Sequence, residues 1–102
     1  MATHEALMIT PRDNVATSLG EVEPESEVRV RLGKEVRTIR ALEKIPFGFK
    51  IAVERIAKGS SVTKYGEPIG VASVDIESGQ LVHIHNVEGA RGRGDLEKGA
   101  SK

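Results

Sequence analysis

Ile76-Glu77-Ser78-Gly79-Gln80-Leu81-Val82 repeats a pattern that the chain has already used twenty residues upstream. Ile56-Ala57-Lys58-Gly59-Ser60-Ser61-Val62 has the same form, I-x-x-G-x-x-V, and a degenerate third copy runs from Val22 to Val28 with Glu25 at the glycine position. In such a unit an apolar residue anchors a strand end, glycine supplies a turn with positive φ, and the next strand starts at valine. Because a solenoid needs about three or more stacked units, the two regular copies favour a set of folded-over hairpins.

The segment before the repeats predicts one hairpin. Val28, Val30 and Leu32 alternate with arginine, which is the period-two pattern of a half-buried strand. Gly33-Lys34 then turns the chain, and apolar residues within 36–42 carry the return strand.

Two shorter strands and very little helix complete the expected fold. Residues 7–10 read as a first strand ended by Pro11, and residues 15–19 read as a second. At most a turn or two of helix is expected near residues 54–58. The expected fold class is therefore mainly β, with a folded domain over residues 1–90 and a flexible tail of glycine and charged residues over 91–102.

The composition excludes several classes of protein. The 15 basic residues balance the 15 acidic ones, so there is no net field of the kind that holds nucleic-acid phosphates. The absence of cysteine excludes disulfides, thiolate metal sites and cysteine nucleophiles. The amino terminus has no signal-peptide pattern and no apolar run approaches a membrane span of roughly 20 residues, so we expect a cytoplasmic protein without membrane contact.

His83-Ile84-His85-Asn86 is the strongest candidate for chemistry. On a strand, residues i and i+2 point to the same face, so both imidazoles could converge on one ligand while Ile84 faces the core. Two imidazoles suit a first-row metal, although such a site needs further ligands. A pair of surface histidines on a strand edge is the alternative reading.

Two further segments carry groups that could bind an anionic substrate. Lys64 could meet a carboxylate as a point charge and Tyr65 could donate a hydrogen bond or proton, although a tight turn with a packed Tyr65 explains the same residues. Arg91 and Arg93 could clamp an anionic substrate or an acidic partner surface, and a solvated tail is the alternative.

Four motifs in order resemble one known family. They are Pro46-Phe47-Gly48-x-Lys50-Ile51-Ala52, Ile56-Ala57-Lys58-Gly59, Lys64-Tyr65-Gly66-Glu67-Pro68-Ile69-Gly70 and His83-x-His85-Asn86. Together they are similar to the SAF domain of altronate and galactarate dehydratases, and to the small subunit of sulfolactate sulfo-lyase. The similarity runs from about Leu7 to Asp95.

The resemblance implies a fold, an activity and partners. The fold is the β-clip, an arrangement of folded-over hairpins. The activity is a lyase reaction that removes water, or sulfite in the sulfo-lyase, from a hydroxylated acid, with divalent iron or manganese in the dehydratases. Fused members of the family carry a much larger catalytic region, so this chain resembles a separately encoded small subunit that is not active alone. Its partners would be a large dehydratase subunit and a sugar acid, and a homo-oligomer stays open.

The resemblance also assigns residues. His83 and His85 are expected to be catalytic groups and metal ligands in a site shared with the large subunit. Lys64, Tyr65 and Asn86, together with the two arginines of the tail, are expected to bind substrate.

One position departs from the family pattern. Relatives usually carry histidine between the glycine and the lysine of the first motif, and this chain has Phe49 there. Phenylalanine cannot ligate a metal or move a proton. This difference favours the alternative hypotheses, which are a non-catalytic binding or assembly module, or the small subunit of a sulfolactate sulfo-lyase.

Overall fold

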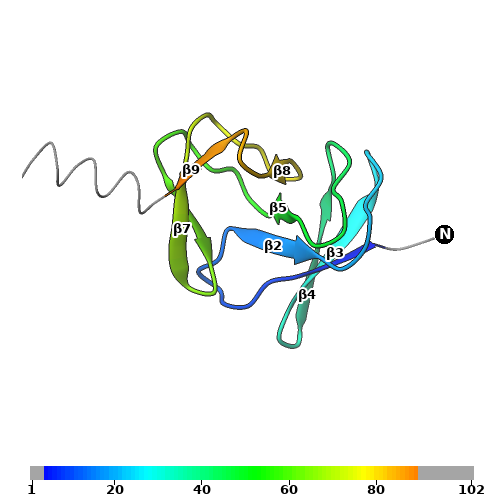
Figure 1. Cartoon of the computed structure of the whole chain (residues 1–102). Coiled ribbons are helices and arrows are strands. Elements are labelled where there is room, and N and C mark those ends of the chain that lie inside the picture. The colour runs from blue at the N-terminus through cyan, green and yellow to red at the C-terminus, as the bar shows by residue number, and fades with distance from the viewer. Residues whose placement is uncertain (1–3, 90–102) are drawn as a thin grey trace, which may run out of the picture.

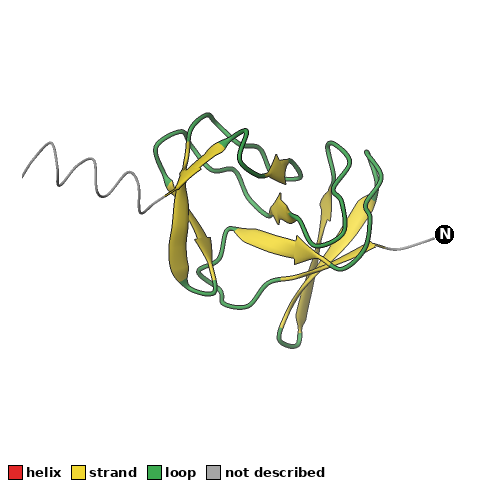
Figure 2. Ribbon diagram, viewed as in Figure 1, coloured by secondary structure: helices red, strands yellow, loops and turns green. Residues whose placement is uncertain are grey.

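The computed structural model describes residues 4–89, which form nine β-strands and no helix (Figures 1 and 2). The strands are β1 (His4–Leu7), β2 (Val15–Ser18), β3 (Glu27–Leu32), β4 (Glu35–Arg40), β5 (Lys50–Ala52), β6 (Ser61–Lys64), β7 (Glu67–Ala72), β8 (Leu81–Val82) and β9 (Val87–Gly89). The mainly β prediction is confirmed. Within the described residues there is accordingly no helix that could cross a membrane.

The strands form two sheets. The larger has six strands in the order β4-β3-β1-β2-β5-β8, and the smaller has three in the order β6-β7-β9. Only the β1–β3 pair among these strands is parallel. Figure 1 shows β7 and β9 at one end of the domain and the β3–β4 hairpin at the other, with β2, β5 and β8 between them.

The repeated pattern is a structural unit with four copies. Gly59 and Gly79 have φ of 89° and 95°, as the pattern predicts, and Glu25 at the same place in the degenerate copy has φ of 68°. A fourth copy, Ile45–Ile51, holds Gly48 at φ of 84°. It escaped the sequence analysis because it ends in isoleucine instead of valine.

Each copy makes the same turn. The residue after the positive-φ position donates its backbone N–H to the carbonyl three residues back, as Gln80 does to Glu77 at 3.1 Å. The leading apolar residues then pair by backbone bridges, Val22 with Ile45 and Ile56 with Ile76. The four turns therefore form two matched pairs, one for each half of the domain.

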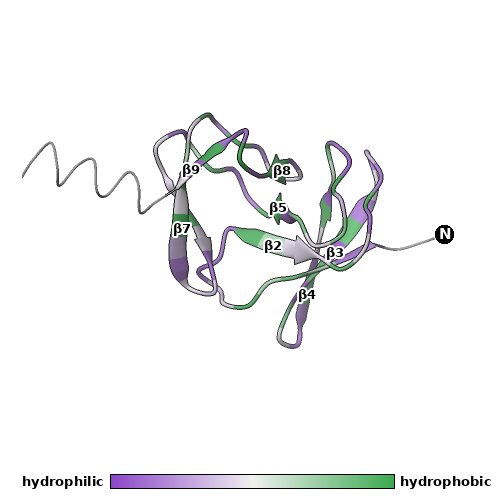
Figure 3. Cartoon of the chain, in the orientation of Figure 1, coloured by the Kyte–Doolittle hydropathy of each residue, from purple (hydrophilic) through white to green (hydrophobic). Residues whose placement is uncertain are grey.

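Two hydrophobic cores lie on opposite faces of the β2–β5–β8 ladder. In β5, Ile51 belongs to the first core and Ala52 to the second, because successive side chains of a strand point to opposite faces. The first core is made by Ala6, Met8, Ala16, Val22, Val28, Val30, Ala41, Ile45, Ile51 and Val53. The second is made by Val15, Ala52, Ile56, Val62, Ala72, Ile76 and Val82. Figure 3 shows the hydrophobic residues of β2, β5 and β8 at the centre of the molecule.

The predicted hairpin of residues 28–42 is present as β3 and β4, and Gly33 turns it with φ of 60°. The predicted strand over residues 15–19 is also present, as β2.

Two predicted elements were wrong. Residues 7–10 are not a strand beyond Leu7, because the carboxylate of Asp13 accepts the backbone N–H groups of Ile9 and Thr10 and folds them into a turn. Residues 54–58 contain no helical turn, because Ile56 bridges to Ile76 and the chain then enters the turn at Gly59. The predicted tail, 91–102, lies outside the described residues.

Candidate functional site

His83 and His85 lie in a turn between β8 and β9, not on a strand as expected. The Asn86 backbone N–H donates to the His83 carbonyl at 3.0 Å and closes this turn. Ile84 is 82% exposed and does not face the core. Since the residues are not extended, the expected convergence of two imidazoles on one strand face is wrong.

The side chain of Asn86 stabilises this turn. That side chain is only 3% exposed and makes two internal hydrogen bonds. Oδ1 accepts the His83 backbone N–H at 2.9 Å, and Nδ2 donates to the Leu81 carbonyl at 2.8 Å. A direct contact between Asn86 and substrate stays a prediction, whereas the geometry supports a role in positioning the histidines.

Phe49 packs against His83. The two ring centroids are 4.7 Å apart with an interplanar angle of 49°. The position at which this chain departs from the family pattern therefore adjoins the first histidine of the candidate motif. A histidine at position 49 would put two imidazoles side by side, and in this chain an apolar ring fills that place.

Lys64 and Tyr65 occupy a tight hairpin turn between β6 and β7. Tyr65 and Gly66 both have positive φ, 58° and 75°, as a two-residue type I′ turn requires. Tyrosine rarely adopts this backbone conformation, so the turn fixes the position of Tyr65. The residue is 57% exposed. The Lys64 ammonium lies over that ring, with Nζ 4.8 Å from the centroid.

The turn is held by Asp13 and Asn14 of the β1–β2 connection, neither of which was selected from the sequence as a site residue. Asp13 Oδ1 accepts the Gly66 backbone N–H at 2.8 Å. The side chain of Asn14 accepts the Thr63 N–H at 2.8 Å and donates to the Ser61 carbonyl at 2.9 Å. An Asp-Asn pair at a turn was the available signal, but its partners are some fifty positions away in the sequence.

Hydrogen bonds to Asp13 lower the pKa of its carboxyl group. Burial alone would raise the pKa of its carboxyl group, but hydrogen bonds from Gly66, Thr10 and Tyr65 outweigh burial and lower the pKa below its ordinary value. The ionised form is therefore the one that the fold stabilises.

Lys50 is a charged residue that the sequence analysis named only as part of a motif. It lies on β5, where its backbone pairs with Thr17 on β2 and with Val82 on β8, so its side chain is on the face of the second core. Burial, and then the charge of Lys64, lower the pKa of its ammonium group. The period-two alternation with the buried Ala52 could have indicated this position.

His83 and Lys50 lie on opposite sides of β5. Phe49, in contact with His83, packs against the first core, whereas Lys50 is on the face of the second. The structure thus places Phe49 against His83 on one side of β5 and Lys50 on the other.

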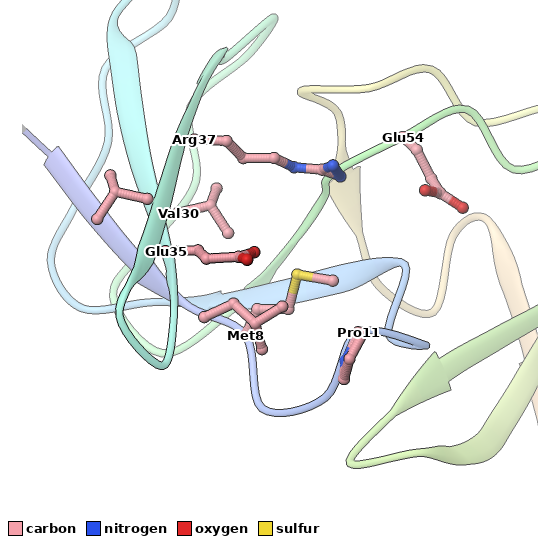
Figure 4. A pocket seen from close by; sticks show the side chains of 8 residues that line it. Met8, Pro11, Val30, Glu35, Arg37 and Glu54 are labelled. Carbon is pink, nitrogen blue, oxygen red and sulfur yellow. The ribbon is translucent and has the colours of Figure 1, made fainter.

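A cavity of about 510 Å³ lies elsewhere, beneath the β3–β4 hairpin (Figure 4). Its lining is Met8, Pro11, Val30, Leu32, Glu35, Val36, Arg37 and Glu54. Figure 4 shows the Arg37 side chain reaching across it, where its guanidinium donates to the Val53 carbonyl at 3.4 Å. No residue selected from the sequence as a site residue lines this cavity.

The described residues do not assemble a complete metal site. Within residues 4–89, no group of three or more histidine, aspartate or glutamate side chains is placed to hold an ion. His83 and His85 could supply at most part of the ligand set. Arg91 and Arg93, the predicted anion clamp, lie outside the described residues.

Comparison with known proteins identifies the domain. The altronate/galactarate dehydratase SAF domain family matches residues 4–90. The altronate dehydratase of Escherichia coli strain K12 is 42% identical over 74 residues, which are 72% of this chain and 14% of that enzyme. The altronate dehydratase of Bacillus subtilis strain 168 is 35% identical over 82 residues, which are 80% of this chain and 16% of that enzyme.

A shorter match joins a second group of lyases. The (2R)-sulfolactate sulfo-lyase subunit alpha of Paracoccus pantotrophus is 43% identical over 47 residues, which are 46% of this chain and 70% of that subunit. The chain thus spans only a small part of the altronate dehydratases but 70% of this sulfo-lyase subunit. With the family match covering all of the described residues, the chain belongs to the altronate/galactarate dehydratase SAF domain family.

Proposed function

We propose that this domain is the accessory part of a lyase that removes water from a hydroxylated sugar acid, and that it works beside a larger catalytic chain. The observation that supports the proposal is the small share of each related enzyme's length that this domain covers. The domain matches altronate dehydratases at 42% and 35% identity yet corresponds to only 14% and 16% of their length. Most of the machinery of such a reaction therefore has to come from elsewhere.

The proposed reaction breaks two bonds of the acid. The proton on the carbon next to the carboxylate goes to a base, the hydroxyl on the following carbon leaves as water, and the resulting enol becomes a 2-keto-3-deoxy acid. Removing the proton adds negative charge beside an existing carboxylate, so nearby positive groups lower the barrier. Divalent iron or manganese would supply such charge in a shared site, with His83 and His85 as the ligands from this chain.

The separate small subunit is supported by the sulfo-lyase relatives. Their alpha subunits are matched over 50% and 70% of their own length, so a chain of this kind exists as a subunit in that enzyme. Sulfolactate is accordingly the second substrate to test, with sulfite in place of water as the leaving group.

Phe49 supports a non-catalytic alternative. Its ring lies against His83 in the place that a second imidazole would take. In this version the turn at residues 83–86 binds or orients the large chain and takes no part in proton transfer.

The test uses the purified chain, the large dehydratase chain and their mixture, each assayed with altronate, galactarate and sulfolactate. We expect turnover only in the mixture. Full turnover by the 102-residue chain alone would contradict the accessory role.

Histidine variants separate the two versions. His83→Ala or His85→Ala should lower the rate of the mixture by about 100-fold or more if the imidazole ligates the metal or transfers a proton, whereas the matched control His4→Ala should not. Unchanged turnover together with lost association in a pull-down establishes the assembly role instead.

A further inference from the structure

Strand β4 is an unprotected edge of the six-stranded sheet. It ends the order β4-β3-β1-β2-β5-β8, so no strand of residues 4–89 lies along its outer side. With six residues it is longer than the other edge strands, β6, β8 and β9. A bulge or a proline often protects a sheet edge from further pairing, and β4 has neither. Such a strand is a template for pairing with one more strand.

The backbone groups that face outward belong to alternate residues of β4. The hairpin turn has two residues, so the pair that closes it is hydrogen-bonded, and such pairs alternate along an antiparallel ladder. Val36 and Thr38 therefore direct their N–H and C=O groups away from β3. At Arg40 the outer side is covered, because its carbonyl oxygen lies only 2.0 Å from the place of a Cβ on Gly79. The accessible edge thus runs over residues 35–39.

Two side chains of this edge carry opposite charges that no ion pair uses. Glu35 and Arg37 both line the cavity beneath the hairpin, and they lie on one face of the strand (Figure 4). Neither forms a salt bridge within the described residues, whereas four other cations do. Arg37 donates only to the Val53 carbonyl, at a long 3.4 Å. Val36, between the two charges, is 40% exposed.

One antiparallel register lets a second copy of β4 match these charges. A two-fold pairing centred on Arg37 would put arginine opposite arginine, which is destabilising. A pairing centred on Thr38 needs the outer groups of Arg40, which are covered. A pairing centred on Val36 uses outward-facing groups and puts Glu35 of each copy opposite Arg37 of the other. Charges that usually discourage edge pairing here favour it.

We propose that β4 joins two copies of this chain, with their sheets continuous across a two-fold axis at Val36. Each Val36 exchanges backbone hydrogen bonds with its counterpart, and the two apolar side chains meet. Two Glu35–Arg37 pairs flank this centre, since every contact of a two-fold interface occurs twice. The net charge of zero leaves no overall repulsion between the copies. Because the contact is short, the dimer is weak, with a Kd on the order of 10⁻⁴ M.

Sedimentation velocity of the full chain, from about 10 µM to about 1 mM, tests the dimer. We expect the average mass to rise toward twice that of the monomer. Glu35→Arg and Arg37→Glu should each weaken the dimer at least about tenfold, because each turns both ion pairs into like-charge pairs. Lys58→Glu is the matched control, because it changes the net charge as Arg37→Glu does, at an exposed position beside the second core. Thermal unfolding of each variant reports its folding.

Further variants identify the register. The double variant Glu35→Arg with Arg37→Glu should dimerise as the parent does, because both ion pairs return with their ends exchanged. An equimolar mixture of the two single variants should form a heterodimer, because one copy then presents two arginines and the other two glutamates. Val36→Pro should abolish the dimer, because proline removes the outward N–H at its centre, a place where edge strands tolerate proline.

Three outcomes overturn the inference. They are a chain that stays monomeric at about 1 mM, charge variants that dimerise as the Lys58→Glu control does, and a double variant that does not regain the dimer. If the chain is monomeric and Val36→Pro loses binding to the large chain in a pull-down, β4 receives a strand of that chain and the dimer is refuted. None of these results bears on the lyase proposal, which is tested by turnover.

Discussion

Gly59 and Gly79 permit a sharp test of the fold because they occupy equivalent places in two copies of the repeat. Their φ angles, 89° and 95°, are nearly equal. A Cβ at Gly59 would meet nothing within 4 Å, whereas a Cβ at Gly79 would lie 2.0 Å from the backbone carbonyl oxygen of Arg40. Alanine at both positions thus shares the conformational strain and differs in the clash.

The expected loss of stability in each variant follows from the conformational strain and the steric clash. The strain of a left-handed residue is about 1–2 kcal/mol for either variant. The clash at Gly79 adds about 1–3 kcal/mol, as for an overpacked core, because backbone has to move. For a domain of this size each 1 kcal/mol lowers Tm by about 4–8 °C. Gly79→Ala should therefore unfold at a clearly lower temperature than Gly59→Ala.

Calorimetric or circular-dichroism melting of the two variants measures the difference. A Gly79→Ala chain that is recovered unfolded beside a folded Gly59→Ala chain agrees with the expectation. Equal melting temperatures, or a lower one for Gly59→Ala, would refute the close packing of the Gly79 turn on Arg40.

Three further predictions concern the residues around the site. Folding lowers the pKa of Asp13, so its contribution to stability is present above the unfolded pKa of about 4 and is lost as pH falls through the folded value. Asp13→Asn should therefore flatten the dependence of the unfolding free energy on pH in that acidic range. An unchanged dependence would contradict this role of Asp13. Asn86→Ala should lower the free energy of unfolding by about 1–3 kcal/mol, because it removes two hydrogen bonds of a buried amide. Urea titration measures this loss, and the control variant His85→Ala, at an exposed position, should stay within about 0.5 kcal/mol of the parent. Phe49→His should create a two-imidazole pair with His83 and increase the affinity for Ni²⁺ or Zn²⁺ in calorimetry, and no gain in affinity would show that the two side chains cannot converge on an ion.

Much of the fold could be predicted from the repeat because each copy carries its own turn signal. Glycine at the positive-φ position is a local requirement, and it marks Gly59 and Gly79 without any knowledge of their partners. The degenerate copy was recognisable even though Glu25 is not glycine. The pairing of Val22 with Ile45 was out of reach, because it depends on two turns meeting in space.

The candidate site was predicted less well because its geometry comes from distant contacts. The spacing of His83 and His85 is compatible with a strand, and the buried side chain of Asn86 turns it into a different structure. The alternation of Lys50 with the buried Ala52 indicates which face of the strand Lys50 lies on, but not how deeply it is buried. Its half-buried state and its exposure to the charge of Lys64 depend on the second sheet.

Strand β5 has only three residues, yet it contributes to both hydrophobic cores. Opening either core removes the support of the other, so the two halves of the domain should open as one cooperative unit. The same strand carries Lys50 toward one side and follows directly after Phe49 on the other. The face that carries Lys50 and the turn at His83 are therefore joined through the single peptide group between Phe49 and Lys50.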